Sequence, residues 1–217
     1  MAAKRKLSNP LALAVLTILS ERPLHQYGVA RLLRERGKEH SIKINYGSLS
    51  TVVHNLHKHG FIEVSDVQRQ GNRPERTVYA LTPEGRREMH DWLAELVAVP
   101  VHEFPLFETA LSLILALHID EARELLDQRL AARQAQTAAI REGLRGFTDT
   151  LPRVVLIETE YQLHMIEAEI AWIQGFREEL DQGTLSGAEV WREISETGKI
   201  PDALRDLEET TDQTTDQ

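Results

Sequence analysis

The sequence predicts a mainly α-helical protein: an N-terminal winged helix-turn-helix with a β-hairpin wing, followed by a C-terminal α-helical, coiled-coil-like dimerisation domain. Apolar residues recur at helical spacing through most of the chain, one pair of β-type segments follows the third such stretch, and two heptad patterns fill the second half. We expect the winged helix over residues 1–90, the helical domain over 91–200 and a disordered polar tail over 201–217.

Two helices and a short strand open the predicted N-terminal domain. The first helix begins at Pro10, with Ser8 or Asn9 as its cap, and runs to about residue 20. The second covers about residues 26–36 and ends at Gly37, because glycine readily stops a helix. An alternating pattern at 42–44 predicts a short strand.

A third helix is expected over about residues 47–59. Its apolar residues follow the spacing i, i+3, i+4, i+7, which predicts one buried face: Leu49, Val52, Val53 and Leu56. Two strands follow, at 61–67 and 77–81, joined by a polar segment. Thr82 and Pro83 then open a helix that runs to about Ala98. This order of elements is that of a winged helix-turn-helix, in which the third helix can enter a DNA major groove.

The second half is predicted to be helical. Residues 104–117 are strongly apolar, Asp120 is expected to cap a long helix to about Gly146, and another helix covers about 153–181. A shorter one is expected over 188–195. Two heptad seams predict an antiparallel helix pair, and we expect its apolar stripe to form a homodimer. The alternative is that the two helices cover only each other. The candidate dimerisation residues are Leu126, Leu130, Ile140, Leu144, Leu156, Leu163, Ile166, Ile170 and Ile173.

Charge is divided unevenly along the chain. The net formal charge of the 217 residues is −9. Residues 1–90 hold 15 Lys and Arg against 8 Asp and Glu, a net of +7, whereas residues 91–217 hold 10 against 26, a net of −16. A basic module fused to an acidic one indicates that the first meets a polyanion. We therefore expect a double-stranded DNA operator as the partner of the winged helix, with the acidic half facing away from the duplex.

The sequence favours a cytoplasmic protein with no membrane partner. The absence of Cys excludes disulfides and thiolate metal sites. Lys4-Arg5-Lys6 before an apolar stretch resembles the start of a signal peptide, but no small-residue cleavage site follows, and the stretch is shorter than the about 20 residues of a membrane span. We expect no cofactor and no metal, since the spacing of His54, His57 and His59 does not place them on one helical face. Without a catalytic motif, we expect no enzyme.

An ordered series of short motifs resembles the PadR family of bacterial transcriptional regulators. The series comprises Leu11 to Leu19, His25 to Gly28, Tyr46 to Leu49, His59 to Ile62, Gly71 to Pro74, Val78 to Gly85 and Glu167 to Ile173. The resemblance covers roughly residues 10–182. It implies a dimeric regulator, most simply a repressor, that binds a near-palindromic operator. It also implies release by a small, often aromatic, effector, for which the candidate residues are Phe104, Phe107, Met165 and Trp172.

Candidate DNA contacts are the polar residues of the third helix and the cations around the wing. Hydroxyl and amide groups can contact base edges, and Asn55 can pair with adenine, whereas the cations suit phosphate or a narrow minor groove. For Tyr27 and Tyr46 we expect packing rings whose hydroxyls contact phosphate. The full set is Tyr27, Lys43, Tyr46, Ser48, Ser50, Thr51, His54, Asn55, Lys58, Arg69, Asn72, Arg73 and Arg76. The alternative function is a winged-helix protein–protein adaptor that does not bind DNA.

Overall fold

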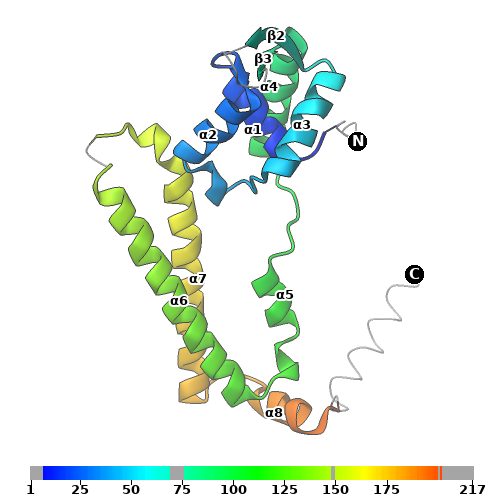
Figure 1. Cartoon of the computed structure of the whole chain (residues 1–217). Helices are drawn as coiled ribbons and strands as arrows, with labels where there is room; N and C mark the ends of the chain where they lie inside the picture. Colours follow the sequence, from blue (N-terminus) through cyan, green and yellow to red (C-terminus); the bar gives the residue numbers. More distant parts are fainter. Residues whose placement is uncertain (1–6, 69–75, 148–149, 200, 202–217) are drawn as a thin grey trace. The chain divides into compact units, whose positions relative to one another are not determined.

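Helix α1 (Pro10–Leu19) lies at the centre of the first of two compact units, residues 1–102 and 103–217. The computed structural model describes residues 7–68, 76–147, 150–199 and 201 (Figure 1). Eight of the ten α1 residues are buried, since other elements pack around the helix on several sides. The Asn9 side chain accepts a hydrogen bond from the Leu11 N–H at 3.0 Å, so Asn9 is the cap.

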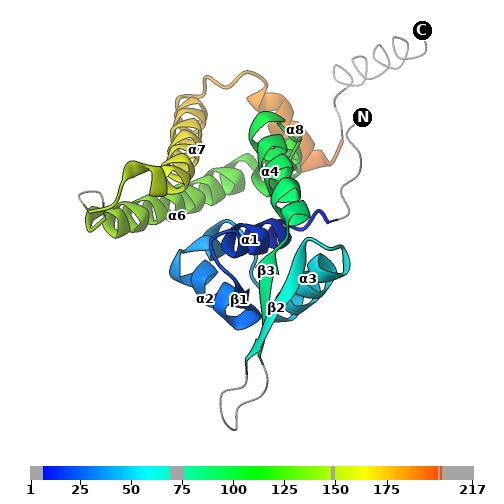
Figure 2. The ribbon, with the colours of Figure 1, turned by 90° about the horizontal axis from the view of Figure 1, so that it is seen from above.

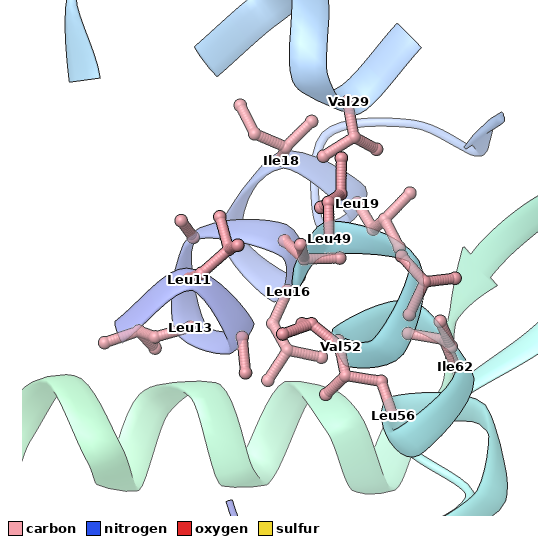
Figure 3. Packing of buried hydrophobic residues seen from close by; sticks show 14 of the residues in the cluster. Leu11, Leu13, Leu16, Ile18, Leu19, Val29, Leu49, Val52, Leu56 and Ile62 are labelled. Carbon is pink, nitrogen blue, oxygen red and sulfur yellow. The ribbon is translucent and has the colours of Figure 1, made fainter. Parts of the chain in front are cut away.

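Helices α2 (Gln26–Glu35) and α3 (Tyr46–Lys58) pack against α1, with the short 3₁₀ helix η1 (Lys38–His40) between them in the chain (Figure 2). Both helices match the predicted ranges to within a residue. The close view in Figure 3 shows Leu49, Val52 and Leu56 of α3 packing among α1 leucines. The predicted apolar face of the third helix is therefore the buried one.

The sheet has three antiparallel strands in the order β1-β3-β2, of which β2 (Ile62–Gln68) and β3 (Arg76–Leu81) form the predicted hairpin. The predicted strand at 42–44 is wrong. The third strand is instead β1 (Leu24–His25), which pairs with β3 through Leu24 and Tyr79. Because β1 and β2 occupy both edges of β3, residues 42–44 have no edge of β3 to pair with, and Ile42 and Ile44 only pack against the core.

Helix α4 (Pro83–Ala98) belongs to the first unit. Its N-cap is Thr82, whose Oγ1 accepts from the Gly85 N–H at 3.0 Å, as the sequence predicts. Trp92, 5% exposed, lies in the same core as α1. The charge boundary drawn at His90 thus falls inside α4, and the unit continues to His102 because Trp92 anchors the helix.

The second unit is helical and has its own core. Its elements are α5 (Leu106–Ser112), η2 (Ile114–Ala116), α6 (Ile119–Arg145), η3 (Arg153–Val155), α7 (Ile157–Gln182) and α8 (Ala188–Thr197). The core joins α6, α7 and α8 and includes Trp191, whose Nε1–H donates to the Leu117 carbonyl at 2.9 Å. The prediction that Asp120 caps α6 is wrong, because the helix begins one residue earlier, at Ile119. The Asp120 carboxylate lies in the first turn of the helix, where the helix dipole favours negative charge.

Helices α6 and α7 form an antiparallel pair within one chain. Ion pairs join the two helices, and the residue numbers of their partners increase along α6 while they decrease along α7. The pairs are Asp127 with Arg177 at 2.6 Å, Arg133 with Glu169 at 2.9 Å and Arg141 with Glu167 at 2.7 Å. Arg133 lies seven residues after Leu126, and Arg177 lies seven residues after Ile170, so both occupy heptad-seam positions. These ion pairs explain why charged residues interrupt the apolar seams.

No helix among the described residues is long and apolar enough to span a membrane. The predicted polar tail lies outside the described residues, except for Pro201.

Candidate nucleic-acid interface

Helix α3 is held to the first unit by one face and presents the other faces outward. Leu49 and Leu56 are fully buried, and Val52 and Val53 are nearly so. The Asn45 side chain accepts from the Gly47 N–H at 3.0 Å and caps the start of the helix. Gly60, with φ of +74°, follows its end. The helix is therefore anchored at both ends while its polar side chains point away from the core.

The polar residues of α3 lie on two flanks. Ser48, Thr51, Asn55 and Lys58 follow helical spacing along the flank nearer α1, and Ser50 and His54 lie on the other. All are exposed except Asn55, which is half-buried. Hydroxyl and amide groups thus line one edge of the helix, which suits contacts to base edges if the helix enters a major groove.

A groove separates that edge of α3 from the start of α1. It has a volume of about 410 Å³ and is lined by Leu7, Ser8, Asn9, Ala12, Ser48, Thr51, Val52 and Asn55. The sequence predicted DNA contacts for Ser48, Thr51 and Asn55 but not for Ser8 and Asn9, because no periodic pattern links residues so far apart in the chain.

Three candidate cations of the first unit form no ion pair with another described residue. Lys43 is exposed before α3, Lys58 ends that helix and Arg76 begins β3. By contrast, Arg31 pairs with Glu35, and Arg36 pairs with Glu21 through a bond of 2.8 Å from Nη2. Arg31 and Arg36 therefore contribute less of the +7 charge to a phosphate backbone than the sequence count suggests.

The hairpin provides the wing. Its register runs from Ile62 opposite Leu81 to Gln68 opposite Arg76, with an irregularity between Val64 and Asp66. Arg69, Asn72 and Arg73 lie outside the described residues, so their predicted roles stay predictions. A β-bulge at a register shift such as that between Val64 and Asp66 increases the local twist of a hairpin.

The two predicted tyrosines begin helices. Tyr27 is 62% exposed, so the expectation that its ring packs is wrong: the ring faces solvent near His25, with ring centroids 6.2 Å apart. Tyr46 begins α3, and its side chain is outside the description. An exposed ring at the start of α2 leaves the Tyr27 hydroxyl available for a phosphate.

The candidate effector residues all belong to the second unit, where the structure brings two of them together. Phe107 of α5 meets the edge of Trp172 at a centroid distance of 6.1 Å, and the Arg129 guanidinium lies 3.6 Å above the Phe107 ring. Trp172 also stacks on Phe176 at 5.2 Å. Phe104 and Met165 are 80% and 54% exposed. A separate groove of about 340 Å³ on the α6–α7 pair is lined by other residues, among them Gln134, Thr137 and Gln174.

The candidate dimerisation residues face mainly inward. Leu126, Ile166 and Ile173 are buried between the helices of the same chain, and the other six are half-buried. A second apolar stripe of α7, whose residues are spaced by four, four and seven positions, is exposed instead: Ile157, Tyr161, Met165 and Trp172. Helix α7 is thus apolar on two faces, only one of which α6 covers.

Across the described residues, no group of three or more His, Asp or Glu side chains is placed to hold a metal ion. His57, one of the three histidines weighed for a metal, lies at the edge of Tyr79 with ring centroids 6.1 Å apart.

Comparison with known proteins places these features in a class. Residues 15–91 match the model of the transcriptional regulator PadR-like family. None of the curated proteins compared with this chain matches it.

Solved structures show the same fold. Bacillus subtilis PadR in complex with operator DNA is 20% identical, with a TM-score of 0.65 over 81% of this chain and 99% of that one. The same protein in complex with p-coumaric acid is 20% identical, with a TM-score of 0.64 over 79% and 98%. A PadR-like transcriptional regulator from Bacillus cereus is 16% identical, with a TM-score of 0.55 over 80% and 99%.

The first unit is therefore a winged-helix domain of the DNA-binding type, followed by C-terminal helices. Its residues 15–91 match the transcriptional regulator PadR-like family, and the resemblance predicted from the sequence is confirmed over those residues.

Proposed function

We propose that this protein is a homodimeric PadR-type repressor that binds a near-palindromic operator and is released by a small aromatic effector. The observation that carries the proposal is the polar outer face of α3, held by a buried apolar face beside a hairpin wing, in the unit that matches the family. Repression would follow from occupation of promoter DNA by two recognition helices set about one helical turn apart.

Within this proposal, α3 reads bases and the surrounding cations bind the backbone. Asn55, Ser48 and Thr51 contact base edges, with Asn55 donating to and accepting from adenine. Lys43, Lys58 and Arg76 neutralise phosphates, and Arg73 enters a minor groove from the wing. The Bacillus subtilis PadR complex with operator DNA supports such a use of the shared fold.

A DNA-binding measurement with the full-length protein tests the proposal. Its affinity for the DNA upstream of its own gene is compared with that for random DNA of equal length, at several salt concentrations. We expect tighter binding to the upstream fragment. Equal affinity for both would contradict the proposal, and a stable complex with a basic protein in its place would favour the adaptor.

Two variants test the roles of the residues. Asn55→Ala should reduce the preference for the upstream fragment, by about 1–3 kcal/mol of discrimination. Arg73→Ala should weaken binding to both fragments alike. Arg192→Ala, an exposed change on α8, is the control and should alter neither. Unchanged DNA affinity in both test variants would mean that another face meets the duplex.

The effector part of the proposal concerns the aromatic cluster of Phe107, Trp172 and Phe176. Three packed aromatic rings, with the Arg129 guanidinium above that of Phe107, suit a planar aromatic acid. The p-coumaric acid complex of Bacillus subtilis PadR makes that compound a suitable probe. We expect it to release the DNA from the wild type and to act less well on Phe107→Ala, which changes the cluster outside the exposed stripe of α7. Equal release from both proteins would move the effector site elsewhere.

A further inference from the structure

The side chain of His25 joins the edge of the sheet to the start of α2. His25 is the last residue of β1, where it pairs with Val78 of β3, and α2 begins at the next residue. Its Nδ1 accepts a hydrogen bond from the Gly28 N–H at 2.7 Å, so His25 is the N-cap of the helix. The side chain is half-buried, which leaves it within reach of protons from solvent.

This hydrogen bond requires a neutral imidazole. A neutral ring can accept at Nδ1 while Nε2 carries the proton, whereas both nitrogens of a protonated ring are donors. Protonation therefore leaves the Gly28 N–H without its acceptor and places a cation at the helix N-terminus, where the helix dipole disfavours positive charge. The caps of α1, α3 and α4 are Asn9, Asn45 and Thr82, none of which gains a proton near neutral pH. Among these four helices, α2 alone has a cap that acid can remove.

The imidazole ring lies close against the first turn of α2. A Cβ atom at Gly28 would lie 3.2 Å from both Cε1 and Nδ1 of His25 and 3.4 Å from Cδ2 of Leu24. Carbon atoms in favourable contact are about 3.5–4.0 Å apart, so a side chain at position 28 would crowd the ring. No acidic residue stands in the first turn of α2, so no carboxylate there can replace the cap.

No ion pair between His25 and another described residue opposes its titration. Strand β1 packs against β3 and α2. Two nearby carboxylates are already paired, Glu21 with Arg36 and Glu35 with Arg31. The titratable side chains on β3, on α2, in the segment before β1 and at the edge of Tyr79 are Glu21, Arg22, Tyr27, Arg31, Arg34, Glu35, His57, Arg76 and Tyr79.

Tyr27 lies between the cap and the residue that the cap binds. Its exposed ring is inclined by 38° to that of His25, with the ring centroids 6.2 Å apart. Because the bond from Gly28 to His25 closes the turn that contains Tyr27, the cap determines the direction in which the Tyr27 hydroxyl leaves the helix. That hydroxyl is the candidate phosphate contact at the start of α2.

We propose that His25 is a positioning residue for DNA binding: its neutral imidazole caps α2 and holds Tyr27 toward a phosphate, and protonation of the ring removes the cap and weakens binding in acid. This inference rests on the proposed function and adds a pH dependence to it. The sign follows from the bond, since the acceptor is present at high pH and is lost as the ring gains a proton.

The test measures binding of the full-length protein to the upstream fragment between about pH 5.5 and 8, where histidine side chains change charge, at one salt concentration. His25→Asn offers a side-chain oxygen that can cap but does not titrate, and His25→Ala offers none. At about pH 8 we expect His25→Ala to bind about 5-fold more weakly than the wild type, which corresponds to about 1 kcal/mol for a typical N-cap. His25→Asn should recover most of that loss.

The pH profile carries the decision. As pH falls to about 5.5, the affinity of the wild type should fall by up to about 5-fold relative to His25→Asn, because the other titrating groups are common to both proteins. His90→Asn, a change at an exposed position of α4, is the control and should follow the profile of the wild type.

Tyr27→Phe separates positioning from stability. If His25 acts through the Tyr27 hydroxyl, His25→Ala should cost less than about 2-fold in affinity once that hydroxyl is gone, whereas a cap that only stabilises the fold would cost the same in both backgrounds.

Two results would overturn the inference while the wild type still prefers the upstream fragment. One is an affinity relative to His25→Asn that does not change with pH, and the other is an equal cost of His25→Ala with and without the Tyr27 hydroxyl. In either case the proposed function stands. If the wild type shows no preference at any pH, the proposed function itself fails.

Discussion

Gly85 is the described glycine at which an added Cβ atom would be most crowded. A Cβ atom there would lie 2.0 Å from the Phe61 carbonyl oxygen and 2.8 Å from its carbon, so the backbone of α4 contacts the end of the α3–β2 turn directly. Because both partners are backbone, neither can move aside as a side chain could.

We predict that Gly85→Ala lowers the free energy of unfolding by about 1–3 kcal/mol, the usual cost of overpacking. Urea denaturation measures it. The matched control is Gly47→Ala on α3, where a Cβ would meet only Asn45 Oδ1 at 3.5 Å, an ordinary contact. The free energy of unfolding of that variant should rise by up to about 1 kcal/mol, because alanine favours a helix more than glycine does. Equal stability of the two variants would contradict the tight approach at Gly85.

Glu169 of α7 lies between two arginines of α6. Its side chain is 19% exposed and accepts hydrogen bonds from Arg129 at 2.6 Å and Arg133 at 2.9 Å. Burial raises the pKa of Glu169, but the bonds from Arg133 and Arg129 outweigh it and hold the pKa below its usual value.

The direction of that shift determines a pH dependence. Since the pKa of Glu169 is lower in the folded protein than in the unfolded chain, its stabilisation is fully present above the unfolded value of about 4.3 and is lost as pH falls through the lower folded value. We predict that the free energy of unfolding falls more steeply below about pH 4.3 in the wild type than in Glu169→Gln. Urea titrations at several pH values measure this.

The control for this prediction is Glu167→Gln on the same helix. Glu167 pairs with Arg141, but both side chains are more exposed, at 36% and 60%. Near neutral pH, Glu167→Gln should lower the free energy of unfolding by less than about 1 kcal/mol. Glu169→Gln should lower it by about 1–3 kcal/mol. If the two variants lose the same stability, the Arg129–Glu169–Arg133 cluster does not stabilise the helix pair.

At the scale of elements, α7 differs from α3 in having two apolar faces. One packs on α6 through Ile166, Ile173 and Leu180, and the other exposes Ile157, Tyr161, Met165 and Trp172. A helix with two apolar faces is typically buried on both of them. The proposed dimer is therefore expected to use the exposed stripe, while the heptad residues first predicted for it hold the hairpin together.

We predict that Tyr161→Glu shifts the protein from dimer to monomer, because it places a charge in the middle of the stripe. Sedimentation velocity at micromolar concentration measures the mass. Gln174→Glu, which adds the same charge to an exposed position of α7 outside the stripe, should remain dimeric. A wild type that sediments as a monomer would refute the dimer, and a dimeric Tyr161→Glu would refute this interface.

At the scale of the whole molecule, the chain has two separate cores. One gathers the α1 residues and Trp92, and the other includes Ile173 and Trp191. Because each unit has its own buried core, we expect each to unfold as a cooperative group.

We predict two unfolding transitions in urea, followed by Trp fluorescence. Gly85→Ala should shift only the transition of the unit that contains Trp92, and Glu169→Gln only that of the unit that contains Trp191. A single transition that moves as a whole in both variants would show that the units unfold together.

Secondary structure could be predicted from the sequence where residues close together in the chain determine it. The buried face of α3, the cap at Thr82 and the hairpin follow from apolar spacing and turn residues, which act over a few residues. The candidate residues of α3 could be named for the same reason, since a periodic apolar face defines the opposite polar one.

Only the tertiary structure decided which distant segments meet. It placed β1 rather than residues 42–44 beside β3, Ser8 beside Thr51, and Glu169 between Arg129 and Arg133. These partners come from different elements, so no local period encodes them. The same holds for α7, because periodicity shows two apolar stripes but not which of them α6 covers.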